Sequence, residues 1–187
     1  MAGNRGFTLI EVIVVASIIA ILAGILVPMI FNQIDEAKIS RAQTECKSIS
    51  SAMLMFRKET GKWPYYVPDC SGTYSTLQTG TGNLPASAAG WQINSNAIPF
   101  GVILNLPGQG ITGALQSCYN GKAQSYLMED KPDPWGNMYI VNTANFVTDG
   151  PVWVISAGPN GQLETSVNSP TLNDLIPSGD DIGVRLK

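Results

Sequence analysis

Histidine is absent from the 187 residues, and charged residues make up only 13% of them. That charged share is about half of the ~25% typical of soluble domains. Without histidine, the commonest general base and the commonest ligand of zinc, copper and iron are missing. No nucleophile motif or glycine-rich phosphate loop takes its place. The sequence therefore predicts a protein that is not an enzyme.

Basic residues are few as well, with 11 Lys and Arg against 14 Asp and Glu and a net charge of −3. They are scattered, which argues against a nucleic-acid partner. The cysteines number 3, at Cys46, Cys70 and Cys118. Because no two of them have the C-x-x-C spacing, zinc-ribbon and thioredoxin-type sites are excluded.

A long apolar run occupies residues 7–31, and Glu11 is its only charged residue. A helix of this length reaches roughly 37 Å, more than the ~30 Å of a bilayer core. The run is too long for the apolar part of a cleaved secretory signal. It predicts a transmembrane helix segment over residues 7–31, with the end that carries Arg5 in the cytoplasm.

Glu11 is unusual, because a carboxylate near the membrane end of a helix either reaches the interface or has a function. The residues from Gly6 to Glu11 resemble the processing site of type IV prepilins and of type II secretion pseudopilins. The resemblance implies that prepilin peptidase removes a leader of residues 1–6 by cutting between Gly6 and Phe7, and that Phe7 is then N-methylated. It also implies that Glu11 guides assembly by pairing with the N-terminal ammonium of a neighbouring subunit.

Pro28 lies within the apolar run and removes one helical hydrogen bond. Such a proline is tolerated in membrane helices. The resemblance adds an assembly hypothesis, in which the helix melts locally around Pro28 when subunits pack into a filament. Both interpretations stay open.

Residues 32–60 are predicted to continue as an amphipathic helix. Apolar residues recur there at spacings of three and four, as on one helix face, at Ile39, Ala42, Cys46, Ile49, Met53 and Phe56. Gly61 and Pro64 mark the end of the helix. We expect this stripe to pack on the chain's own head. A coiled-coil dimer is the alternative, although the stripe spans fewer than three heptads.

Residues 61–187 are predicted to form the head of an α+β fold. The part from 61 to about 131 is rich in Gly, Ser, Thr, Asn and Pro, which is typical of a long loop-rich insertion. Residues 138–141 and 152–155 are predicted strands. The link between them is short, so we expect a small antiparallel sheet under the long N-terminal helix, followed by a C-terminal loop.

Several head motifs resemble the major pseudopilin of type II secretion systems. They are Tyr126-Leu127, the run from Pro132 to Asn137, Tyr139, the run from Ser156 to Gly161, and Asp180-Asp181-Ile182. Residues from about 67 to 120 do not match that family closely and form an enlarged middle. The resemblance implies a structural subunit of a type IV pilin-like filament, with the major pseudopilin as the preferred interpretation. The alternative is a major or minor subunit of a surface type IV pilus used in adhesion or motility.

Partners and location follow from the same resemblance. The implied partners are further copies of the chain, prepilin peptidase, an inner-membrane assembly platform and minor pseudopilins. The chain would cross the bacterial inner membrane once, with its head in the periplasm, before joining a periplasmic or extracellular filament. A tip or priming subunit is less favoured, because such subunits often lack the glutamate found here at Glu11.

Major pseudopilins bind calcium in their C-terminal loop, and Asn160, Asp180 and Asp181 stand at the matching positions. Calcium takes six to eight hard oxygen ligands. Asn160 replaces the usual aspartate, and Glu164 or Asp174 could compensate for the missing charge. The alternative is that Asn160-Gly161 is only a turn and that the aspartates form a solvated pair.

A disulfide is expected, because the head would lie outside the cytoplasm. Cys70 and Cys118 both lie in the enlarged middle, and a bridge between them is the preferred pairing. Cys46, on the apolar stripe of the helix, is expected to be a buried core residue. The sequence leaves pairings that involve Cys46 open.

Overall fold

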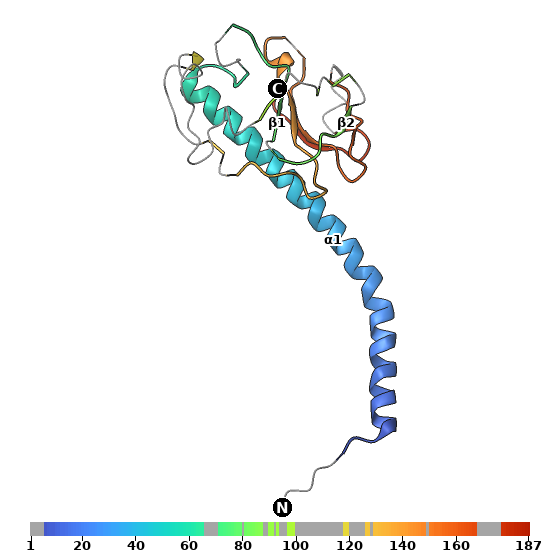
Figure 1. The fold of residues 1–187 in the computed structure, drawn as a ribbon. Coiled ribbons are helices and arrows are strands. Elements are labelled where there is room, and N and C mark those ends of the chain that lie inside the picture. The colour runs from blue at the N-terminus through green and yellow to red at the C-terminus, as the bar shows by residue number, and fades with distance from the viewer. Residues whose placement is uncertain are drawn as a thin grey trace, which may run out of the picture. The chain divides into compact units, whose positions relative to one another are not determined.

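The computed structural model describes residues 6–65, 71–79, 81–87, 90–91, 93, 97–99 (backbone only), 118–119, 126–127, 129–148, 150–167 and 177–187. The chain forms two compact units, Met1–Lys38 and Ile39–Lys187, and each is described by itself. Helix α1 (Leu9–Thr60) contributes residues to both units (Figure 1).

The first unit is the N-terminal part of α1. Every side chain of this helix from residue 9 to residue 37 is exposed, although most of the side chains up to Phe31 are apolar. The helix continues through Pro28. Its most apolar window has a mean hydropathy of 2.9, and the helix has the length and composition needed to cross a membrane. Such a surface needs lipid or other protein around it.

The second unit contains a five-stranded sheet with the order β3-β1-β4-β5-β7. Its strands are β1 (Thr76–Gln78), β3 (Ala97–Pro99), β4 (Ile140–Asn142), β5 (Trp153–Ser156) and β7 (Ile182–Arg185). All neighbouring pairs are antiparallel except β1 and β3, which are parallel. A parallel pair of short strands, β2 (Ala86–Ser87) and β6 (Gln162–Leu163), stands apart from this sheet. The short 3-10 helix η1 (Thr143–Phe146) follows β4.

One face of the sheet packs on α1, as predicted. The helix contributes Cys46, Ile49, Ala52, Met53 and Phe56 to a core that also contains Leu77, Val141 and Val154 of the sheet and Tyr139 just before β4. The predicted stripe is therefore buried in the chain's own head, which supports this packing over the coiled-coil alternative. Only Ile39, at the start of the stripe, is exposed.

The opposite face of the sheet is also covered. Successive strand residues point to opposite faces, so Ile140, Trp153 and Ile155 face away from α1 and belong to a second core. Trp91 and Leu163 pack against them there. Burial on both faces explains why the sequence of β5 is apolar throughout instead of alternating.

The end of α1 agrees with the prediction. Gly61 has a φ of +75°, in the left-handed region that glycine adopts without strain. Its N–H donates to the carbonyl oxygen of Arg57 at 2.9 Å, which closes the last turn.

Strand β7 was not predicted, because the sequence indicated only a C-terminal loop there. Gly183 interrupts this short strand, and glycine weakens a strand pattern. The glycine has a structural reason, since a Cβ at this position would lie 2.8 Å from the carbonyl oxygen of Val154 on the neighbouring strand. The α+β class and the long helix on a mainly antiparallel sheet are confirmed.

Candidate functional site

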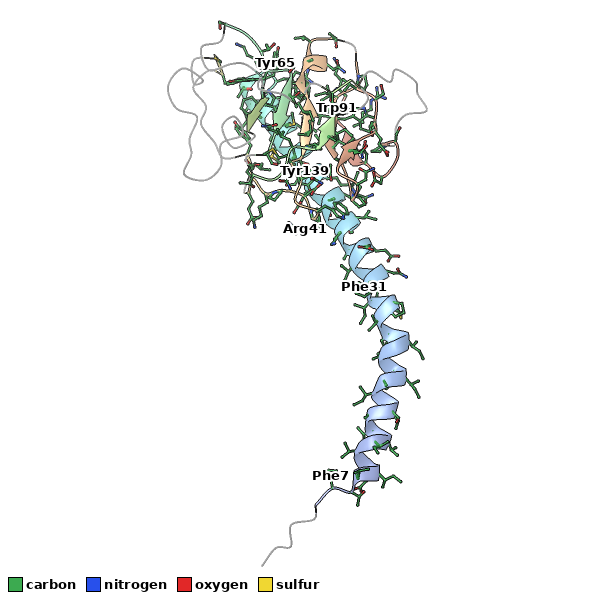
Figure 2. The ribbon with its side chains drawn as sticks, turned by 45° about the vertical axis from the view of Figure 1, so that its right-hand side comes forward. Phe7, Phe31, Arg41, Tyr65, Trp91 and Tyr139 are labelled. Carbon is green, nitrogen blue, oxygen red and sulfur yellow. The ribbon has the colours of Figure 1, made fainter. Side chains whose placement is uncertain are left out.

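The predicted processing site precedes the first turn of α1, where Phe7 is 87% exposed (Figure 2). Thr8 is the residue before the helix and Glu11 lies three residues later. The backbone N–H and the hydroxyl of Thr8 both donate to Oε2 of Glu11, each at 2.8 Å. The N–H of Glu11 donates in return to Oγ1 of Thr8 at 3.4 Å. The two residues form a capping box, which satisfies N–H groups that the first turn leaves without helical partners.

This geometry adds a local role for Glu11 to the predicted assembly role. Within one subunit its carboxylate already accepts hydrogen bonds from Thr8. Thr8 was not singled out in the sequence, although the T-x-x-E spacing before an apolar run is the usual signal of a capping box.

In the head, Asp133 connects the two turn motifs on which the second resemblance rests. Its Oδ1 accepts the N–H groups of Trp135 at 3.0 Å and Asn137 at 2.8 Å. Its Oδ2 accepts the hydroxyl of Ser156 at 2.6 Å. Asp133 is buried, so this carboxylate is held by neutral donors alone among the contacts that the structure describes.

The same region contacts α1 through Tyr139 (Figure 2). The Tyr139 hydroxyl donates to Oε2 of Glu45, and Nε of Arg41 donates to Oε1 of the same carboxylate at 2.8 Å. Burial of Tyr139, followed by its hydrogen bond to Glu45, raises the pKa of the phenol. The hydroxyl therefore stays protonated and remains a donor to the helix.

The predicted calcium residues meet at the turn before β7. Gly158 has a φ of +61°, and a Cβ there would overlap the backbone carbonyl of Asp180. The two segments therefore touch backbone to backbone. The N–H of Asn160 donates to Oδ2 of Asp180 at 3.0 Å. Oδ2 of Asp181 accepts the N–H groups of Glu164 at 2.9 Å and Thr165 at 2.6 Å.

Each of the two aspartates also keeps one buried oxygen unused. Oδ1 of Asp180 and Oδ1 of Asp181 have no hydrogen-bond partner among the described residues. Burial raises the pKa of Asp181, and the hydrogen bonds from Thr165 and Glu164 oppose that rise. The ion pairs Arg41–Glu45 and Lys131–Glu129 do not include these aspartates.

Asp180 and Asp181 are the described residues that could hold a hard cation. Two adjacent carboxylates with buried free oxygens are costly unless a positive charge lies near them. No group of three or more His, Cys, Asp or Glu side chains able to hold a metal is present among the described residues. A bound ion would therefore need backbone carbonyls and water as well, which calcium accepts.

The remaining predicted ligands are Asn160, Glu164 and Asp174. The Asn160 side chain accepts the N–H of Gln162 at 2.6 Å, so it shapes the turn. Oε2 of Glu164 accepts the N–H of Asp180 at 3.3 Å, which brings this carboxylate close to the aspartate pair. Asp174 lies outside the described residues.

Comparison with known proteins identifies the family of the chain. The prokaryotic N-terminal methylation motif matches residues 1–27. The type IV major fimbrial protein FimA of Dichelobacter nodosus is 36% identical over 128 residues, which cover 65% of this chain and 70% of that protein. The chain belongs to the type IV pilin family.

Other relatives of this pilin extend over almost its whole length. The type II secretion system core protein G of Pseudomonas aeruginosa is 26% identical over 171 residues, covering 91% of this chain and 94% of that protein. Its counterpart from Escherichia coli is 27% identical over 162 residues, covering 87% and 86%. Among solved structures, none is a significant match to the pilin chain.

The cysteines of the pilin differ in state. Cys46 is free and buried, and its thiol donates to the carbonyl oxygen of Ile182 at 3.5 Å. Burial raises the pKa of this thiol, so it stays protonated and unreactive. The prediction of a buried core cysteine is confirmed. Cys118 is buried and disulfide-bonded. Cys70 lies outside the described residues, so its pairing with Cys118 stays a prediction.

Proposed function

We propose that this chain is the major pseudopilin of a type II secretion system, a structural subunit that assembles into a pilin-like filament through α1. The observation that carries the proposal is the match to core protein G relatives over 91% of the chain, head included. The contacts of Asp133 support it, because they join the two turn motifs that resemble the pseudopilin head. The relatives named here are secretion core proteins and a fimbrial protein, which favours a structural role over catalysis.

In this proposal, prepilin peptidase cuts between Gly6 and Phe7, and the new N-terminus is methylated. Residues 7–31 hold the subunit in the inner membrane with its head in the periplasm. Other copies of the chain, minor pseudopilins and an inner-membrane platform are its assembly partners. The exposed apolar surface of α1 supports membrane anchoring followed by packing among helices.

Intact mass spectrometry tests the processing step. Chain recovered from cells with prepilin peptidase is expected to lack residues 1–6 and to carry one added methyl group. Chain from cells without the peptidase should keep its full mass, and a Gly6→Val variant should stay uncut in both strains. An uncut wild-type chain in peptidase-positive cells would contradict the proposal.

A surface type IV pilus is the second candidate function. The higher identity to the fimbrial protein, 36%, favours it, although that match covers only 65% of this chain. Deleting the gene separates the two. The pseudopilin proposal expects enzymes normally secreted by the system to accumulate in the periplasm while surface pili persist. Loss of surface pili with normal secretion would select the pilus.

We further propose that the turn at Asp180 and Asp181 binds calcium. The two unused carboxylate oxygens carry this proposal, and Glu164 is the nearest further carboxylate that the contacts indicate. When bound, the ion would supply the positive charge that the aspartates lack. It would also link the segment after β6 to the start of β7.

Thermal unfolding of the full chain in detergent micelles tests calcium binding. At a free calcium concentration of about 100 times the Kd, binding adds roughly 2.7 kcal/mol. This should raise the Tm by roughly 5–10 °C relative to EDTA. Asp181→Asn keeps the shape of the side chain and should abolish the calcium-dependent rise, whereas Asp35→Asn, on the exposed part of α1, should keep it. An equal rise in both variants would contradict the proposed site.

A further inference from the structure

Trp91 comes from the enlarged middle of the chain, the part that does not resemble the pseudopilin head. Its side chain is only 4% exposed and packs in the second core, on the sheet face opposite α1 (Figure 2). Its indole Nε1–H donates to the carbonyl oxygen of Thr165 at 2.6 Å. A residue of the insertion is thereby attached to the segment after β6.

Thr165 continues this connection to the acidic turn. Its backbone N–H donates to Oδ2 of Asp181 at 2.6 Å, and its hydroxyl accepts the N–H of Ser178 at 3.0 Å. Thr165 is 3% exposed, so water does not compete freely for these groups. Three hydrogen bonds therefore fix this single residue between Trp91 on one side and the Asp181 turn on the other.

Fixing Thr165 also fixes the aspartate. With Oδ2 of Asp181 occupied by the N–H groups of Glu164 and Thr165, Oδ1 is the oxygen left without a partner. The orientation of the carboxylate then depends on where the backbone of residues 164 and 165 lies. Trp91 holds that backbone from the far side through a buried hydrogen bond, whose geometry a phenyl ring cannot reproduce.

We propose that Trp91 is a positioning residue for the calcium site, which it supports through Thr165 without contacting the ion. This inference rests on the proposed calcium binding at Asp180 and Asp181. In this proposal, a residue of the enlarged middle of the chain tunes the calcium affinity of the turn at Asp180 and Asp181. Cation binding depends on how well the ligands are held before the ion arrives.

Trp153 provides a matched control in the same core. It packs in the same cluster as Trp91 and is 1% exposed, but its Nε1 has no hydrogen-bond partner among the described residues. Trp153→Phe and Trp91→Phe remove the same atoms from the same core. Only Trp91→Phe removes the hydrogen bond to Thr165.

The experiment is calorimetric titration of calcium into the full chain in detergent micelles, well below the Tm. Trp91→Phe is expected to raise the Kd for calcium about fivefold, which is the change that the loss of one neutral hydrogen bond produces. Trp153→Phe should leave the Kd unchanged, even if both variants lower the Tm in EDTA. An unchanged Kd in Trp91→Phe, or equal weakening in both variants, would overturn the positioning role while leaving calcium binding intact. A wild-type chain that takes up no calcium would instead remove the proposed metal site and this inference with it.

A second measurement needs no variant at Trp91. The chain has 4 tryptophan residues. Incorporation of 5-fluorotryptophan gives each of them a fluorine resonance. Phenylalanine variants at Trp63, Trp135 and Trp153 assign three resonances, which leaves the fourth to Trp91. Calcium is expected to shift the Trp91 resonance and to leave that of Trp63, which stacks on Phe146, unmoved. A Trp91 resonance that calcium does not move would refute the inference.

Discussion

Replacement of Glu11 by alanine is expected to yield a subunit that is cleaved after Gly6 but does not enter filaments. A carboxylate in the low-dielectric membrane layer needs a cation, and the proposed partner is the N-terminal ammonium of a neighbouring Phe7. Without that pair, we expect filament yield to fall at least about tenfold. Sheared filament preparations and the membrane fraction, compared by immunoblot, give the measurement.

Glu11→Gln separates the charge of Glu11 from its capping role. The amide oxygen of glutamine can still accept the N–H and hydroxyl of Thr8, as in capping boxes that use glutamine. The negative charge is lost. If pairing with the ammonium drives assembly, Glu11→Gln should fail to form filaments as Glu11→Ala does. Normal filaments from Glu11→Gln would show that the cap alone matters and would reject charge pairing.

Replacement of Asp133 by alanine is expected to cause a large loss of stability in the head. It leaves three donors without their acceptor, namely the partly buried N–H groups of Trp135 and Asn137 and the buried hydroxyl of Ser156. At about 1 kcal/mol for each unpaired donor, we expect a loss of about 3 kcal/mol. The Tm should fall by roughly 10 °C, measured by near-UV circular dichroism in detergent.

Asp133→Asn is the matched control, since it keeps the shape and one acceptor oxygen. That oxygen can still bind the two N–H groups, and its new NH₂ group can donate to the Ser156 hydroxyl. The loss should therefore be clearly smaller than for alanine. Equal losses in the two variants would mean that the negative charge of Asp133, and not its hydrogen bonds, stabilises this region.

Features that repeat along the chain could be predicted from the sequence. The three-and-four spacing from Ala42 to Phe56 predicted both the helix and its buried face. The apolar residues around Tyr139 and Trp153 predicted two neighbouring antiparallel strands. The T-x-x-E spacing at Thr8 was also available and would have predicted the capping box.

Contacts between distant residues could not be predicted in this way. Ser156 meets Asp133, and Thr165 meets both Trp91 and Asp181, only because the sheet brings their segments together. The spacing of residues in the sequence does not indicate which distant segments will come into contact. The predicted calcium residues came from a resemblance, and the unused oxygens of Asp180 and Asp181 became visible only in the fold.

The order of the strands along the chain also constrains how the head can fold. Helix α1 is synthesised before the sheet, and although Leu77 of β1 follows it soon, Val141 and Val154, which also cover its buried face, come from the second half of the chain. The thiol of Cys46 on α1 donates a hydrogen bond to the carbonyl oxygen of Ile182, the first residue of β7, across a sequence separation of 136 residues. Contacts of such long sequence separation form slowly. During synthesis the apolar face of α1 therefore stays partly uncovered until the residues of β4, β5 and β7 have been made, and we expect a holding chaperone or the membrane surface to shield it over that time.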